Sequence, residues 1–496
     1  MIVIDGTSLT CVDVAAIARR RAGVEMAKAG WDRAAAAAAA ARALTATRGV
    51  YGRTTGVGAN RGIGVEDDDA RTHGLRLVRS HAGGAGPLLA PELGIAMLAV
   101  RANQIAAGGS GVDPGVLDVL ADCVNGSWQP PIRRYGGIGT GDLAALATTA
   151  LCLLGERDWL PPPDASAVRH GPDQPAEPTG AQPRFALDPA DALAFISSNA
   201  ATLGEAAIAC ADLYALLTAG TVIAALSFLA ARASAEPYAD AVQAARGHPG
   251  QRRVGHELRA LLAEETRAPA RIQDPYGFRV LPQVHGAALD ALGYAEQVVT
   301  REINAAAENP LIDVAGQQIW HNGNFHAAYV ALALDAARAA VSQTAALSAA
   351  RLGALMDDRC TGLATFLAMD TPPSSGLLIL EYVAHSALAD IRQLATPVVL
   401  GGAVLSVGTE EHASFATQAA RSATGVVQAY RVVLACELVA AVRALRLRET
   451  RPAGGRLALA FDRADTAIPH VVTDRPLDAD LAAAEEVLAG LGDAVR

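Results

Sequence analysis

Residues 213–231, LYALLTAGTVIAALSFLAA, form a stretch of 19 residues without a charged side chain. A stretch of that length is long enough to cross a bilayer. Small and polar residues interrupt it, however, at Thr218, Gly220, Thr221 and Ser227. An apolar helix with such interruptions is typical of the centre of a large helical bundle, where it is buried on all sides. We therefore predict a buried core helix here and no membrane span.

Helical periodicity continues on both sides of this stretch. Helices are expected at about 92–125, 190–234, 282–308, 325–356, 375–396 and 414–446, with a short helical tail at about 475–494. A hydrophobic fraction of 51% with only 4% aromatic residues favours closely packed helices over sheets. We predict a mainly all-α protein, with an elongated central bundle of long helices and a smaller mixed N-terminal region.

Composition divides the chain into three expected parts: an N-terminal region at 1–190, the central bundle at 191–450, and a helical tail at 451–496. The Ala34–Ala41 run has high helix propensity but little side chain to bury, which predicts an outer or hinge-side helix. Residues 161–191 are rich in proline and cannot continue a helix, so we expect a mobile surface excursion there.

Charge and cysteine usage narrow the possible partners and location. The net charge is −10 and no block of basic residues occurs, which argues against nucleic acid as a partner. The six cysteines lie far apart without a CxxC pair, and the N-terminal MIVIDGTSLT is too polar for a secretory signal. We expect a reduced, cytoplasmic protein. His321, His326 and His412 do not have zinc-ligand spacing, so no metal site is predicted.

Several loops between the expected helices carry polar residues that a plain bundle does not require. They are VYGRTTGVG at 50–58, RSHAGGAG at 79–86, GGIGTGDLAALA at 136–147, IQDPYGFRVLPQVHG at 272–286, ENPLID at 308–313, HNGNFHA at 321–327 and GTEEHAS at 408–414. In this order, these stretches resemble the histidine and aromatic amino-acid ammonia-lyase family. The strongest matches are in 272–286 and in GNFHA, and the resemblance extends from about residue 4 to 450.

The resemblance implies an ammonia-lyase/fumarase-like helical fold and a homotetramer whose active sites each combine three subunits around a small-molecule substrate. It also implies an electrophilic ring, methylidene-imidazolone, which this family makes from a consecutive Ala-Ser-Gly. The glycine amide nitrogen attacks the carbonyl two residues back, in a turn that glycine makes accessible. Loss of water then converts the serine side chain into an exocyclic methylene.

The sequence departs from this pattern around the ring. The triad reads Gly139-Thr140-Gly141, and dehydration of threonine gives an ethylidene whose extra methyl lies on the carbon to be attacked. In a tight pocket one surplus methyl costs about 1–3 kcal/mol. The asparagine that supports the family's ring falls on Ser197, with Asn199 two residues too late unless the register shifts. GTEE also replaces NQED before the last motif, although Glu410 remains.

Roles for the remaining residues follow from the resemblance. The expected catalytic residues are Tyr51, Tyr276, Glu410 and Thr140, and the expected substrate contacts are His81, Arg279, Gln273, Ser197, Phe325 and Asn309. Tyr51 is the expected base and Arg279 presents a planar fork to a carboxylate. Plainer alternatives stay open: a loop tyrosine at 51, a helix-start salt bridge at Arg279, and at Glu410 a carboxylate stabilised by a helix N-terminus.

Three functions remain open. We expect a ring-free enzyme without a cofactor that performs elimination, conjugate addition or cyclisation on a small carboxylate- or amino-acid-like substrate in a specialised biosynthetic pathway. There the Thr140 hydroxyl and backbone amides at its helix start polarise the substrate. The first alternative is a ring-dependent ammonia-lyase or aminomutase, in which Gly139, Thr140 and Gly141 cyclise. The second is a binding relative without catalysis.

Overall fold

The computed structural model describes residues 1–161, 181–369 and 373–495, which group into two compact units. Each unit combines three separate segments. The first unit comprises Met1–Ile208, Glu296–Leu332 and Pro397–Arg421, and the second comprises Ala209–Ala295, Ala333–Thr396 and Ser422–Arg496. The division expected from the sequence differs, because its parts 1–190, 191–450 and 451–496 are each one continuous stretch of the chain. Most of the predicted surface excursion, residues 162–180, lies outside the described residues.

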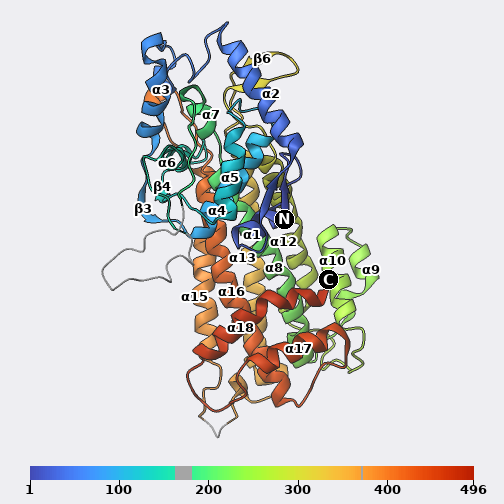
Figure 1. Ribbon diagram of the computed structural model, residues 1–496. Helices are drawn as coiled ribbons and strands as arrows, with labels where there is room; N and C mark the ends of the chain where they lie inside the picture. The colour runs from blue at the N-terminus through green and yellow to red at the C-terminus, as the bar shows by residue number, and fades with distance from the viewer. Residues whose placement is uncertain (162–180, 370–372, 496) are drawn as a thin grey trace, which may run out of the picture. The chain divides into compact units, whose positions relative to one another are not determined.

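The described chain is mainly helical, as predicted, and five long helices occur where the periodicity placed them (Figure 1). They are α8 (Ala200–Ala231), α12 (Leu281–Ile303), α13 (Ala328–Met356), α15 (Ile379–Leu394) and α16 (Ala416–Leu447). The pattern at 92–125 forms two helices, α4 (Pro91–Ala106) and α5 (Gly115–Asn125), and the tail contains α18 (Asp478–Leu491). Asp113 and Pro114 come directly before α5, and proline commonly begins a helix in this way.

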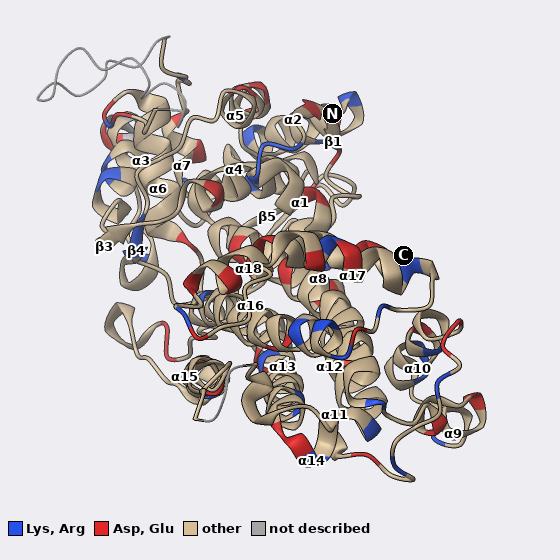
Figure 2. Ribbon diagram, turned by 90° about the horizontal axis from the view of Figure 1, so that it is seen from below, with Lys and Arg blue, Asp and Glu red and all other residues tan. Residues whose placement is uncertain are grey.

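Among the described residues, two helical stretches are long and apolar enough to cross a membrane by length and composition, Pro189–Ala231 and Ala416–Leu447. In the structure, 89% of the apolar window of the first and 72% of that of the second are buried. Charged residues are sparse along α8, whose ribbon is almost entirely tan in Figure 2. This burial is that of core helices, as expected for 213–231.

The first unit has the mixed character predicted for the N-terminal region. Strands β1 (Ile2–Ile4) and β2 (Val24–Met26) pair in parallel, whereas β3 (Ala85–Leu88) with β4 (Arg133–Tyr135) and β5 (Leu311–Asp313) with β6 (Gln318–Trp320) pair antiparallel. The shorter helices of this unit are α1 (Cys11–Ala18), α2 (Lys28–Thr45), α3 (Asp67–His81), α6 (Leu143–Leu154) and α7 (Ala192–Ile196). Each strand is short, so these pairs shape loops and do not form a sheet core.

Helix α2 leaves Ala36 and Ala39 exposed, as expected of an outer helix, but its other face is buried. Ala37 and Ala41 are fully buried and form a cluster with Val50, Ile312 and Ile319. The small alanine side chains allow the β5–β6 hairpin to pack closely against the helix. The same cluster therefore anchors Val50, the residue that precedes Tyr51.

The second unit contains a buried ionic core. Glu437 on α16 accepts hydrogen bonds from Arg351 Nε at 2.6 Å and Nη2 at 2.8 Å, and from the hydroxyls of Ser227 at 2.7 Å and Ser348 at 2.5 Å. The side chains of Arg351 and Glu437 are 2% and 0% exposed. Four hydrogen bonds offset the desolvation of this carboxylate. The other helices of this unit are α9 (Asp240–Ala244), α10 (Pro249–Leu261), α11 (Tyr276–Arg279), α14 (Asp358–Thr361) and α17 (Gly455–Ala467).

Candidate active site

Seven of the predicted site residues line one cavity of the first unit, with a volume of about 790 Å³. They are Tyr51, His81, Thr140, Ser197, Asn309, Phe325 and Glu410. A volume of this size is typical of a small-molecule site. Residues from three distant segments of the chain therefore meet at one place. Loops that only connect helices do not require such a convergence of polar side chains.

A buried ion pair holds the loop that carries Tyr51. Arg53 Nη1 lies 3.0 Å from Asp191 Oδ1, and Arg53 Nη2 donates to the Gly111 carbonyl at 2.9 Å. The Arg53 and Asp191 side chains are 3% and 5% exposed. Because the pair is desolvated and also bonded to backbone, it restricts the Tyr51 backbone strongly.

The phenol of Tyr51 receives a backbone hydrogen bond. The Gly58 N–H donates to Tyr51 Oη at 2.8 Å. Such a donor stabilises negative charge on the oxygen when the phenol has lost its proton. This contact suits Tyr51 to the role of a proton acceptor.

Gly58 occupies a position that other residues fit poorly. Its φ is +56°, and a Cβ built there would lie 2.4 Å from Ser406 Oγ. Ser406 Oγ in turn accepts from the Ala59 N–H at 2.9 Å. Glycine is therefore required both by the left-handed backbone and by the close approach of Ser406.

His81 is the last residue of α3, and its hydrogen bonds assign its tautomer. Its Nδ1 lies 2.8 Å from the Leu77 carbonyl oxygen, which only accepts. Nδ1 therefore carries the hydrogen, so Nε2 of the neutral ring is an acceptor. His81 thus places a second basic atom at the cavity.

Glu410 reaches the cavity from the segment before α16. Its backbone pairs with Leu405 across a short bridge, where the Leu405 N–H donates to the Glu410 carbonyl at 2.8 Å. Within the described residues, the Glu410 carboxylate makes no hydrogen bond or ion pair. Arg61, which also lines the cavity, donates to Thr409 Oγ1 at 3.0 Å. The site therefore contains two charged groups: the cation of Arg61, and the carboxylate of Glu410, which is free to bind a ligand.

Ser197 and Asn309 are held by one buried arginine of α4. Arg101 donates to the carbonyls of Phe195 at 3.0 Å and Ala194 at 2.7 Å, and pairs with Glu308 at 2.8 Å. The Asn309 N–H then donates to Ser197 Oγ at 3.2 Å. Arg101 thus connects the end of α7 to the segment before β5, and the position of both site residues depends on it.

The Gly139-Thr140-Gly141 turn is held through its two glycines. The Gly139 carbonyl accepts from Ser414 Oγ at 2.7 Å and from the Ala327 N–H at 3.3 Å, while the Gly141 N–H donates to Asn199 Oδ1 at 3.0 Å. The Thr140 hydroxyl makes no hydrogen bond to any described residue. Both backbone groups that ring closure joins in the family are thus bonded to separate partners.

The support of this turn differs from the sequence alignment. Asn199, and not Ser197, contacts the triad, and its Nδ2 also donates to the Phe325 carbonyl at 2.6 Å. The sequence contained a sign of this contact, because Asn199 lies only two residues after Ser197 in SSNAA at 197–201. Ser414 was overlooked as well, although it ends the quoted motif GTEEHAS.

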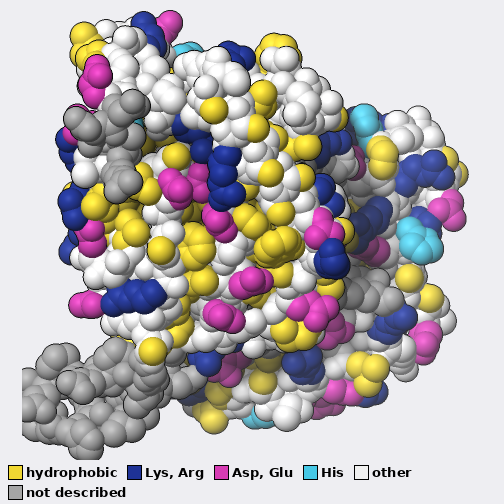
Figure 3. Space-filling view, turned by 45° about the horizontal axis from the view of Figure 1, so that its top comes forward, with side chains coloured by type: hydrophobic (Ala, Val, Ile, Leu, Met, Phe, Trp, Pro, Cys, Tyr) yellow, Lys and Arg dark blue, Asp and Glu magenta, His cyan; other side chains and the backbone are white. Residues whose placement is uncertain are grey.

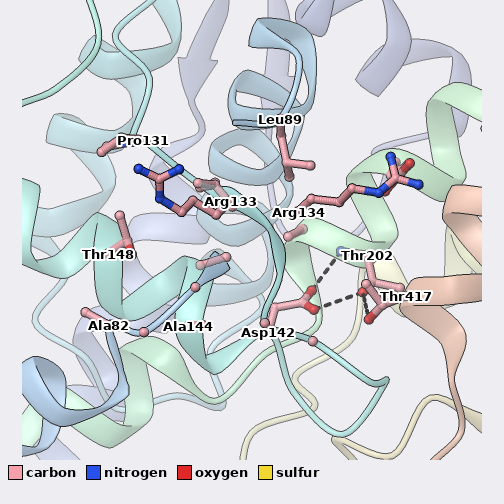
Figure 4. A pocket seen from close by; sticks show the side chains of 18 of the residues that line it. Ala82, Leu89, Pro131, Arg133, Arg134, Asp142, Ala144, Thr148, Thr202 and Thr417 are labelled. Carbon is pink, nitrogen blue, oxygen red and sulfur yellow. Dashed lines mark hydrogen bonds between the residues drawn. The ribbon is translucent and has the colours of Figure 1, made fainter. Parts of the chain in front are cut away.

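A smaller cavity of about 130 Å³ is lined by Gly137 and Asp142, which lie near the turn in the sequence (Figure 4). Asp142 accepts there from the Thr202 N–H at 2.7 Å and from Thr202 Oγ1 at 2.9 Å, and the Thr417 hydroxyl lies 2.8 Å from Thr202 Oγ1. Burial raises the pKa of Asp142 to about 6, although the Thr202 bonds act in the opposite direction. These buried polar groups bond to one another. We therefore assign them a structural role beside the turn.

The structure brings together two of the three histidines that were considered for metal binding. His326 Nε2 lies 3.0 Å from His412 Nδ1. In the part of the chain that the structure describes, no group of three or more potential ligands could hold a metal ion. The pair connects the two segments whose Ala327 and Ser414 bond the Gly139 carbonyl.

The other three predicted site residues belong to the second unit and form a cluster of their own. Arg279 donates to Gln273 Oε1, and its guanidinium lies 4.7 Å from the centre of the Tyr276 ring. Tyr276 is 66% exposed. The cluster therefore presents a phenol and a guanidinium side by side, in a cation–π contact.

Comparisons with known proteins identify the family of the chain. The model of the family described as aromatic amino acid lyase matches residues 9–465. The histidine ammonia-lyase of Anaeromyxobacter sp. (strain K) is 34% identical, over 98% of this chain and 98% of its own. That of Sorangium cellulosum (strain So ce56) is 35% identical, over 97% and 96%.

Solved structures with the same fold include tyrosine aminomutase from Streptomyces globisporus. It has a TM-score of 0.90 and 26% identity, and the match covers 100% of this chain and 98% of that chain. Histidine ammonia-lyase from Trypanosoma cruzi has a TM-score of 0.89 and 26% identity, with 99% and 94% covered.

Proposed function

Because this chain belongs to the aromatic amino acid lyase family, we propose that it is an amino-acid-processing enzyme that uses Tyr51 as its base and works without a methylidene electrophile. The observation that carries the proposal is the combination of two features in one cavity. The Gly58 N–H donates to Tyr51 Oη at 2.8 Å, whereas the triad has threonine at its central position.

The methylidene group does not fit the residues present. Thr140 carries a methyl group on its Cβ, so dehydration yields an ethylidene and cannot yield a methylidene. The Thr140 side chain also faces the cavity of Tyr51 and Glu410, where the extra methyl would crowd a substrate. We therefore derive the chemistry from proton transfer by side chains alone.

The proposed reaction is an elimination, a conjugate addition or a cyclisation of a small carboxylate- or amino-acid-like substrate. Tyr51 acts as a phenolate, which the Gly58 N–H stabilises, and it becomes a neutral phenol when it removes a proton from carbon. The free carboxylate of Glu410 and the acceptor Nε2 of His81 bind an amine or a ring nitrogen of the substrate. Arg61 supplies positive charge for a substrate carboxylate.

We also propose a homotetramer with shared active sites, a cytoplasmic location and a role in a specialised biosynthetic pathway. The exposed pair of Tyr276 and Arg279 supports shared sites, because it offers a phenol and a guanidinium to a ligand held by another subunit. The cysteines of the described chain are all free thiols, which agrees with a reducing compartment.

A ring-dependent ammonia-lyase or aminomutase is the second candidate, and one observation favours it. The Gly139 carbonyl receives hydrogen bonds from both Ser414 and Ala327, which would polarise it toward attack by the Gly141 nitrogen. Intact-protein mass separates the two candidates. We expect the wild-type mass to equal that of the unmodified sequence, and a deficit of two waters would favour the ring. Thr140→Ser, which restores the family's serine, is the variant in which such a deficit is expected.

The role of Tyr51 is tested by Tyr51→Phe, which removes only the phenol oxygen. Substrates are found by screening the proteinogenic amino acids and their unsaturated acids against the wild type. Turnover should then fall about 10²- to 10⁴-fold in the variant, the usual contribution of a general base. Ligand binding and assembly should persist, and full turnover by the variant would remove Tyr51 from the mechanism.

A further inference from the structure

The loop that carries Tyr51 is held by a histidine outside the proposed machinery. The Tyr51 N–H donates to His321 Nε2 at 3.1 Å. Nε2 accepts here, so the ring hydrogen of neutral His321 is on Nδ1. His321 directly follows β6, in the hairpin that packs on α2.

Two further contacts join the same hairpin to the same loop. Arg48 Nη1 donates to the Ile319 carbonyl at 3.2 Å, and Val50 packs in the buried cluster with Ile319. The segment that directly precedes Tyr51 is thereby anchored to β6. The bond to His321 is the one made by Tyr51 itself.

The charge state of His321 favours this bond near neutral pH. Partial desolvation and, after it, the positive charge of Arg48 lower the pKa of His321. A neutral ring keeps the lone pair on Nε2, whereas an imidazolium has only donors and cannot accept from the Tyr51 N–H.

We propose that His321 is a positioning residue, whose neutral ring accepts from the Tyr51 N–H and so places the phenol of Tyr51 at the Gly58 N–H and the substrate. This rests on the proposed function of Tyr51 as a base. His321 also lines the cavity, but its role is assigned to its contact with the loop, because its Nε2 is occupied by the Tyr51 N–H.

The test compares His321→Gln, which keeps an acceptor at a similar distance from Cα, with His321→Ala, which removes it. His248 is exposed and has no side-chain hydrogen bond to a described residue, so His248→Ala is the matched control. Hydrogen–deuterium exchange at the Tyr51 amide is measured in the full-length protein, together with kcat and KM.

We expect His321→Ala to speed exchange at the Tyr51 amide and to lower kcat by about 3- to 10-fold, with KM little changed, as loss of one hydrogen bond predicts. His321→Gln should restore both values, and His248→Ala should match the wild type. Unchanged exchange and kcat in His321→Ala, or a glutamine variant no better than alanine at a normal melting temperature, would overturn the proposal. Exchange is measured without turnover, so the contact is tested even if Tyr51 is not the base.

Discussion

Gly58 is the position where a single added methyl group tests the assignment of Tyr51 as the base. The substitution Gly58→Ala places a Cβ 2.4 Å from Ser406 Oγ, at a residue whose φ is +56°. Ser406 is bonded to the Ala59 N–H, so it cannot move without loss of that contact. The loop must shift instead, and the Gly58 N–H then leaves Tyr51 Oη.

The expected magnitude follows from these two contacts. A left-handed alanine costs about 1–2 kcal/mol of stability. A hydrogen bond to a charged oxygen contributes about 1.5–3 kcal/mol, so its loss disfavours the phenolate form of Tyr51 by roughly 10- to 150-fold and lowers kcat by up to that factor. We expect the larger effect on kcat, because the bond stabilises the phenolate, which is the form of Tyr51 that accepts the proton.

The assay measures kcat, KM and thermal unfolding for Gly58→Ala and for a control in the same loop. Gly62→Ala is a suitable control, because nothing lies within 4 Å of its added Cβ and its φ is ordinary. If Gly58→Ala retained kcat within about twofold of Gly62→Ala while Tyr51→Phe was inactive, stabilisation of the phenolate by Gly58 would be refuted.

Two stability predictions concern buried carboxylates. Because folding raises the pKa of Asp142 from 3.8 to about 6, its contribution to stability is present at low pH and is lost as pH rises through that range. Asp142→Asn does not titrate, so its stability relative to the wild type should rise by up to about 3 kcal/mol between about pH 4 and 7. Denaturant unfolding across pH measures this, and a constant difference would contradict it. Glu437→Ala should destabilise by about 3–5 kcal/mol, because it leaves Arg351 charged and buried. Asp32→Ala, at the exposed Lys28–Asp32 pair, should change stability by only about 0.3–0.5 kcal/mol, and equal effects would contradict the prediction.

The long helices could be predicted because their signal is local. The charge-free stretch 213–231 and the periodicity around 282–308, 325–356 and 414–446 depend only on which residues recur along the chain. The burial of one face of the alanine run could not be predicted in this way. Whether Ala37 is buried depends on Ile312 and Ile319, which lie far away in the sequence.

The quoted motifs indicated most residues of the cavity, since Tyr51, His81, Phe325 and Glu410 each lie in one of them. Sequence could not assign Asn199 to the triad, because a register difference of two residues at a helix start is resolved only by the packing of α8.

From the sequence alone follow the helical class, the family resemblance and the threonine that excludes a methylidene, because each depends on residue identity and order. Only the tertiary structure decided which partner the polar atoms of the site have: the Gly58 N–H for Tyr51 Oη, Asn199 for the Gly141 N–H, and His321 for the Tyr51 N–H. Hydrogen bonds depend on distance and direction between atoms, and segments separated by up to hundreds of residues acquire these only when the chain is packed.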